Sequence, residues 1–109
     1  MKSRRSKDLK IRTIKSFTDV LILKYLKVHP CSNGYQILCH LHEQYSIIFS
    51  PGTVYHEIHI LERNKLIESE DDEDGRIYRL TDGGEEELFN HANISDQIQM
   101  LVSTILSTA

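Results

Sequence analysis

Three side chains able to bind an anion or a nucleobase recur at helical spacing in the segment Ser50–Lys65. His56, His59 and Arg63 fall on one face of a helix when each residue turns the chain by about 100°. Imidazole and guanidinium groups donate hydrogen bonds to phosphate oxygens and to base edges. A helix with this face can lie in a groove of DNA, although an ordinary surface helix can carry the same residues.

The opposite face of the same segment indicates how such a helix is held. Val54, Ile58 and Leu61 recur at i, i+4 and i+7, which makes one apolar face. Ser50 is a favourable N-cap, and Pro51 suits the first helical position because its missing N–H has no partner there. The segment therefore predicts a helix over about 51–64 that packs on its aliphatic side.

Charge is distributed unevenly along the 109 residues, whose net charge is −3. Residues 1–15 carry seven basic side chains, Arg4 and Arg5 among them, and one acidic side chain, which is a net charge of +6. The other 94 residues carry six basic and fifteen acidic side chains, a net charge of −9. A basic arm before an acidic body is common in chains that touch nucleic acid, and a flexible solubilising terminus is the alternative.

The remaining chain divides into short elements with clear local signals. One helix capped by Thr18 or Ser16 is expected to run to Pro30, with an apolar surface almost all round and Lys24 and Lys27 on its wet side. The elements expected after it are a turn at 32–34, a helix over Tyr35–Tyr45, a short β-prone run over Ser46–Phe49, the helix over 51–64, strands over Leu66–Glu70 and Arg76–Leu80 around a polar turn at 71–75, and a helix capped by Thr81 and Asp82.

The last residues form a narrow aliphatic stripe at helical spacing. A break near Asn93–Ser95 is expected before it, and Gly83 and Gly84 earlier in this region suggest close packing. A terminal helix with such a stripe usually pairs with another helix. The predicted pairing residues are Ile94, Ile98, Leu101, Val102, Ile105 and Leu106.

This order of elements predicts a winged helix-turn-helix. The fold class is mostly α with a small β-hairpin (α+β), and a C-terminal dimerisation helix follows the domain. The predicted organisation is a basic N-terminal arm over 1–15, a winged-helix DNA-binding domain over 16–81 and the dimerisation helix over 82–109.

Several motifs in this order resemble the PadR family of transcriptional regulators from about Ile14 to Leu88. The motifs are LILKYL, NGYQIL over Asn33–Leu38, SPGTVY over Ser50–Tyr55, LERNKLIE over Leu61–Glu68 and RIYRLTDGGEEEL over Arg76–Leu88. The resemblance implies a homodimer joined by its C-terminal helix and often its N-terminal one. It also implies that Thr53 and Tyr55 touch the phosphate backbone of double-stranded DNA.

The predicted DNA contacts combine this resemblance with helix geometry. Two copies of the helix over 51–64 would enter successive major grooves, one DNA turn apart. His56 and His59 would then face base edges, and Arg63 a phosphate or a guanine. Further charge would come from Arg76 and Arg79 in the wing and from the arm.

Two departures from the family pattern are visible. Lys65 stands where the family often has Gly, so Asn64 is expected to take the left-handed turn. The wing carries acidic residues over 71–74, which disfavour phosphate contact. Either the wing tip points away from DNA, or the domain is a winged-helix protein–protein interaction module with little DNA affinity.

Other classes of function lack support in the sequence. His29, Cys31, Cys39, His40 and His42 cluster along the chain, but their spacing is not that of a zinc site, and Cys39 is expected to be a small core residue. No glycine-rich phosphate loop, nucleophile elbow or obvious carboxylate pair is present, so neither an enzyme nor a cofactor is predicted. No membrane span or secretory signal is recognisable, which favours a reduced, cytoplasmic chain. The sequence does not identify the operator, the genes that respond or a small-molecule effector.

Overall fold

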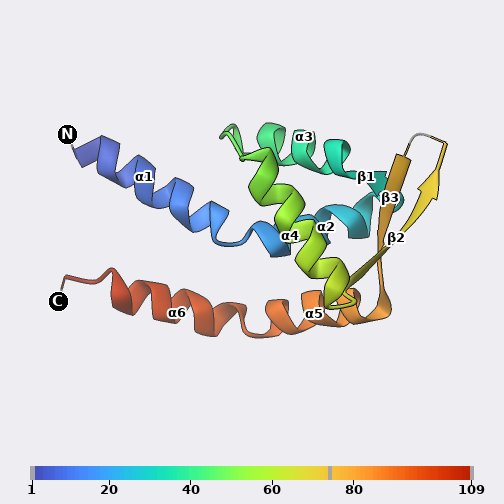
Figure 1. Ribbon diagram of the computed structural model, residues 1–109. Coiled ribbons are helices and arrows are strands. Elements are labelled where there is room, and N and C mark those ends of the chain that lie inside the picture. Colours follow the sequence, from blue (N-terminus) through green and yellow to red (C-terminus); the bar gives the residue numbers. More distant parts are fainter. Residues whose placement is uncertain (1, 74, 109) are drawn as a thin grey trace.

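The computed structural model describes residues 2–73 and 75–108, with side chains described from residue 6 onward. Helices and strands follow one another as a winged helix extended at both ends (Figure 1). The elements are α1 (Lys2–Lys15), α2 (Thr18–Val28), β1 (Ser32–Asn33), α3 (Gly34–Tyr45), α4 (Pro51–Arg63), β2 (Ile67–Asp72), β3 (Gly75–Leu80), α5 (Asp82–Asn93) and α6 (Ser95–Ile105). The predicted mostly helical α+β class and the winged helix-turn-helix are confirmed.

Helix α2 forms the centre of the core, as its all-round apolar pattern predicts. Ile22, Leu23 and Leu26 are each at most 1% exposed, and they join buried side chains of α3 and α4 in one cluster. The expected cap at Thr18 or Ser16 is wrong, because each hydroxyl bonds back to a carbonyl of the preceding helix. Phe17 occupies the N-cap position without a side-chain hydrogen bond.

The basic segment at the start of the chain is helical, and no pattern noted in the sequence predicts this. Lysine and arginine are good helix formers, and Leu9, Ile11 and Ile14 give α1 a half-buried apolar side. Ile14 packs against the core at the junction with α2.

Local caps define the helix-turn-helix. Asn33 accepts a hydrogen bond from the Gln36 N–H, and the Gln36 side chain accepts one from the Asn33 N–H, so α3 begins with a capping box. Ser50 caps α4 as predicted, with Pro51 in its first turn. These caps determine where the two helices begin.

The predicted β-prone run over Ser46–Phe49 is not a strand. Ser46 ends α3 in the left-handed conformation, with φ 52°, and the buried Phe49 carbonyl lies 2.9 Å from His42 Nε2. The third strand is β1 instead, and it pairs with β3 so that the sheet has the order β1-β3-β2. Two-residue strands like β1 depend on a distant partner and carry no local signal.

The wing hairpin is longer than predicted. Pairing runs from Ile67 opposite Leu80 to Asp72 opposite Gly75, and Gly75 takes a positive φ of 116°. The left-handed residue that ends α4 is Lys65 (φ 64°), whereas Asn64 has φ −84°, so the expectation for Asn64 is wrong. The reason is positional, since the left-handed conformation falls one residue after the C-cap.

Two helices complete the chain after the wing. The Thr81 hydroxyl accepts a hydrogen bond from Gly84 N–H at 3.1 Å, which confirms the predicted cap of α5. A Cβ at Gly84 would lie 2.1 Å from the Leu66 carbonyl oxygen, so the predicted close packing is confirmed as well. The expected break falls at Ile94, and the free ends of α1 and α6 lie on the same side of the core (Figure 1).

Candidate nucleic-acid interface

Helix α4 separates its apolar and polar faces as its spacing predicts. Val54, Ile58 and Leu61 are 0%, 1% and 3% exposed and hold the helix on the core. The opposite side carries the imidazoles of His56 and His59 and the guanidinium of Arg63, all of them exposed. A rigidly held helix therefore presents three hydrogen-bond donors to the surroundings.

The beginning of α4 carries the two residues that the family resemblance assigns to the backbone of DNA. Thr53 is exposed, and its backbone N–H donates a hydrogen bond to the hydroxyl of the N-cap residue Ser50. Tyr55 is 43% exposed, and its ring lies against Gly34, where an added Cβ would be 2.2 Å from Tyr55 Cε1. Gly34 therefore allows the first turns of α3 and α4 to approach each other.

Arg76 of the wing is engaged within the chain. Its Nη1 lies 2.9 Å from the Ser69 hydroxyl and 3.6 Å from Glu62 Oε2, and its Nε lies 3.5 Å from Asp71 Oδ1. Ser69 also donates its hydroxyl to Glu62. This network ties the wing to the last turn of α4, and neither Glu62 nor Ser69 stands out in the sequence because the contact is non-local.

Arg79 is engaged on the other face of the hairpin. It donates to Glu70, and its Nε lies 3.7 Å from Glu68 Oε2. Each predicted wing cation thus has two carboxylates beside it. Exposed ion pairs contribute only about 0–1 kcal/mol, so a DNA phosphate can compete for either guanidinium.

The basic first helix shows a different pattern. Arg4 and Arg5 lie outside the residues whose side chains the structure describes. Further along α1, Lys7, Lys10 and Arg12 are exposed. Described cations on α1 therefore reach solvent.

The aliphatic stripe of α6 is open to solvent, as a pairing surface in an isolated chain would be. Ile98 is half-buried. Five of the six predicted pairing residues are between 42% and 75% exposed: Ile94, Leu101, Val102, Ile105 and Leu106. These exposed aliphatic side chains are spaced along α6 and its two ends.

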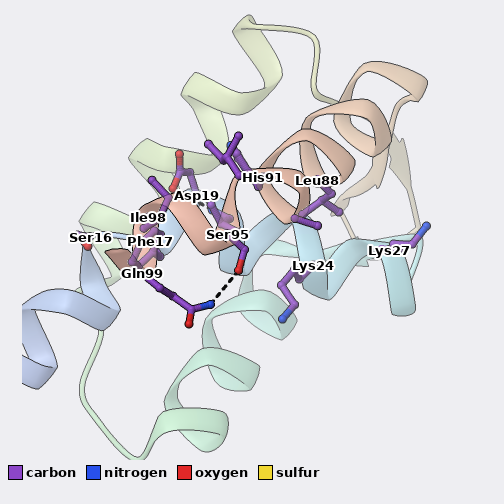
Figure 2. A pocket seen from close by; sticks show the side chains of 13 residues that line it. Ser16, Phe17, Asp19, Lys24, Lys27, Leu88, His91, Ser95, Ile98 and Gln99 are labelled. Atoms are coloured by element: carbon purple, nitrogen blue, oxygen red, sulfur yellow. Dashed lines mark hydrogen bonds between the residues drawn. The ribbon is translucent and has the colours of Figure 1, made fainter. Parts of the chain in front are cut away.

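An open groove of about 810 Å³ adjoins this stripe between α2 and the α5–α6 turn (Figure 2). His91 Nε2 lies 3.4 Å from Glu87, while its Nδ1 is buried without a hydrogen-bond partner among the described residues. The groove is lined by Ser16, Phe17, Asp19, Val20, Lys24, Lys27, Leu88, His91, Ala92, Ile94, Ser95, Ile98 and Gln99.

The histidines and cysteines considered for a metal are dispersed over α2 and α3. The rings of His29 and His40 lie on Tyr25, with centroids 4.7 and 4.5 Å away. Cys39, expected in the core, is half-buried at its edge, and both thiols are free. Within residues 2–73 and 75–108, no three His, Cys, Asp or Glu side chains are grouped to hold a metal ion. No helix in these ranges is long and apolar enough to cross a membrane.

Solved structures of other proteins share the fold of this chain. A PadR family transcriptional regulator from Eggerthella lenta DSM 2243 has 21% identity and a TM-score of 0.79, with 98% of this chain and 96% of that chain covered. A transcriptional regulator from Clostridium thermocellum has 21% identity and a TM-score of 0.76, with 88% and 96% covered. A PadR family transcription regulator from Clostridium difficile R20291 has 25% identity and a TM-score of 0.67, with 84% and 99% covered.

The family comparison gives the same result from the sequence side. No curated protein matches the chain. The model of the transcriptional regulator PadR-like family matches residues 22–90, which span the winged helix from α2 to α5. The predicted resemblance is thereby confirmed, and the chain belongs to the PadR-like family of transcriptional regulators.

Proposed function

We propose that the chain is a homodimeric, sequence-specific regulator that binds double-stranded DNA with α4 in the major groove. The observation that carries the proposal is the division of α4 into a buried aliphatic back and an exposed face of donors. In winged-helix regulators a helix in this position reads base edges. Membership of a family of transcriptional regulators supports the same function.

The contacts on α4 follow from its orientation in the groove. His56 and His59 are assigned to base edges, and Arg63 to a phosphate or a guanine, where a guanidinium can form two hydrogen bonds. Thr53 and Tyr55 are assigned to the phosphate backbone beside the groove.

The wing and α1 supply the other positive charges of this proposal, in different ways. Arg76 and Arg79 are assigned to phosphates, for which each must release the two carboxylates beside it. The acidic tip of the wing is assigned a place away from the DNA. The exposed cations of α1, together with Arg4 and Arg5, are assigned to attraction of the duplex.

The exposed stripe on α6 supports a second copy of this chain as the other partner. Residues 82–109 are assigned to dimerisation, residues 16–81 to DNA binding and residues 1–15 to both charge and pairing. The groove beside α6 includes Ile94 and Ile98 of the stripe in its lining, and we assign it to further contacts with the partner copy. Two joined copies would present their α4 helices to half-sites one DNA turn apart. Because both thiols are free, we place this regulator in the reducing cytoplasm.

A selection experiment tests the function directly. The full chain is incubated with random duplex DNA, bound fragments are recovered, and affinity for the enriched sequence is measured against added salt. A roughly palindromic consensus, and a log–log salt slope of about −0.9 for each neutralised phosphate, are expected. The absence of duplex binding in dilute salt contradicts the proposal.

One specific observation favours a second candidate function. Both wing arginines are paired with carboxylates, and the body of the chain is acidic, which suits a module that binds protein instead of DNA. A chain without duplex affinity that still forms a defined complex with a basic protein would support this candidate.

A further inference from the structure

Tyr35, on the first turn of α3, has no part in the contacts proposed so far. Its side chain is 68% exposed although an aromatic ring of this size usually packs against its neighbours. Tyr35 belongs to the NGYQIL motif over Asn33–Leu38, where it stands at the beginning of a helix. Its surroundings in the fold suggest a more specific role.

Two further tyrosines lie near the same junction of α3, α4 and the sheet. Gly34 precedes Tyr35, and the Tyr55 ring of α4 lies directly against it. Tyr78 of β3 is paired with Ser32 of β1, two residues before α3 begins. The fold thus gathers three phenol groups that are far apart in the sequence.

The Tyr35 hydroxyl already has a partner within the chain, which it would exchange for any group that it contacts outside. A hydrogen bond with Cys39, one helical turn along α3, raises the pKa of Tyr35, and Tyr55 adds to the rise. Burial raises the pKa of Tyr78, with further contributions from Glu62 and Tyr55. Tyr55 therefore lies close enough to both neighbours to influence their titration. Tyr78 is half-buried, which leaves Tyr35 and Tyr55 as the exposed pair.

Tyr55 flanks the outward face of α4, and Tyr35 follows Gly34, against which the Tyr55 ring lies. Tyr55 stands next to His56 in sequence and one helical turn before His59. When a helix lies in the major groove, hydroxyls flanking its base-reading face meet the sugar–phosphate backbone. We propose that Tyr35, together with Tyr55, donates its hydroxyl to a DNA phosphate at the edge of the groove that α4 reads. This inference rests on the DNA binding proposed above and adds a contact from the first helix of the helix-turn-helix.

The test removes single hydroxyls and leaves the rings in place. Tyr35→Phe, Tyr55→Phe and the control Tyr45→Phe, which alters a half-buried ring at the far end of α3, are made in the full chain. Each variant is titrated against two duplexes of about 30 base pairs, long enough for two half-sites. One duplex carries the sequence selected from random DNA, and the other is a scrambled sequence of the same composition.

A phosphate contact predicts a particular combination of results. Tyr35→Phe and Tyr55→Phe each weaken binding to both duplexes by about tenfold, the effect of losing a hydrogen bond to a charged group. The log–log salt slope stays at the parent value because a neutral hydroxyl releases no counterion. Tyr45→Phe binds like the parent, and all three variants keep its thermal midpoint.

Other outcomes overturn the inference. Parent-like affinity of Tyr35→Phe removes the contact and leaves the proposed function intact. A loss confined to the selected duplex marks a base contact and overturns the phosphate assignment. A loss that accompanies a lower thermal midpoint, or that Tyr45→Phe shares, marks a structural role. If the parent binds neither duplex, the proposed function fails and this inference fails with it.

Discussion

Single residues on α4 have contrasting roles that follow from their burial. The aliphatic side chains on its back contribute stability by leaving water, and the exposed donors on its front contribute almost nothing to stability. Substitutions on the two faces should therefore separate folding from binding.

Arg63→Ala is expected to weaken DNA binding by about tenfold. A phosphate contact of Arg63 would also lower the magnitude of the salt slope by about 0.9, whereas a guanine contact would leave the slope close to that of the parent. The unfolding of the variant should match that of the parent, since the side chain is exposed. Fluorescence anisotropy at several salt concentrations measures both quantities. Lys27→Ala on α2 removes the same charge from a residue that pairs with Glu85 and has no assigned DNA contact, and it serves as the control at a protein concentration where both variants have the oligomeric state of the parent. Equal effects of the two substitutions would contradict the assigned contact.

Ile58→Ala is expected to lower the free energy of unfolding by about 2–5 kcal/mol, since its side chain is 1% exposed and the truncation leaves a cavity. Ile48→Ala removes the same atoms from a side chain that is 81% exposed, and it should change stability by less than about 0.5 kcal/mol. Urea unfolding at one fixed protein concentration compares the two. A similar cost at both positions would show that burial on α4 does not hold the helix.

At the scale of elements, the position of α4 depends on how neighbouring segments meet it. The wing is joined to its last turn by Glu62, Ser69 and Arg76, and α5 packs against the wing through Gly84. These junctions are non-local, so altering them should change how elements are placed relative to one another more than whether each one forms.

Gly84→Ala is expected to destabilise the chain by more than about 1 kcal/mol, since the added carbon would lie 2.1 Å from the Leu66 carbonyl oxygen and 2.6 Å from Leu80 Cδ1. Gly52→Ala is the matched control, because its nearest atom would be 3.8 Å away. That helical position should gain about 0.5–1 kcal/mol from the replacement. Thermal unfolding of both variants measures the difference, and two effects of the same sign would refute the packing argument.

Glu62→Gln is expected to tighten DNA binding severalfold, because it removes a carboxylate near the groove and frees Arg76 for phosphate. Glu43→Gln, an exposed change of the same kind on α3, should have a smaller effect. Titration with the selected duplex compares them. Weaker binding by Glu62→Gln would mean that the Glu62–Arg76 pair positions the wing for DNA instead of holding it back.

The whole molecule has a winged core from which a basic helix and an apolar helix extend. The free ends of α1 and α6 lie on one side of that core, and most of the α6 stripe is exposed (Figure 1). Apolar surface of this kind is stabilised when a second copy covers it. The oligomeric state is therefore the property of the whole molecule most open to test.

Deletion of residues 94–109 is expected to give monomers, as measured by light scattering, because it removes the pairing stripe. Leu101→Glu combined with Ile105→Glu should do the same without shortening the chain, whereas Ser103→Glu serves as a control on the same helix. A dimer-sized product from both altered chains would contradict dimerisation through α6.

Local signals in the sequence were sufficient to predict most helices and the fold class. Caps such as Ser50 and Thr81 and the spacing of Val54, Ile58 and Leu61 act within a few residues, so they can be recognised without knowledge of the rest of the chain. The same reasoning predicted the exposed face of α4 and the exposed stripe of α6.

Only the tertiary structure decided features that join distant segments. Strand β1 exists because Ser32 and Asn33 meet β3, the pairing of Arg76 and Arg79 depends on the register of the hairpin, and Tyr35 gains its neighbours from α4. No short window of sequence contains both members of such contacts. Helix preferences, by contrast, are expressed between residues three or four apart, which is why the sequence alone determined them.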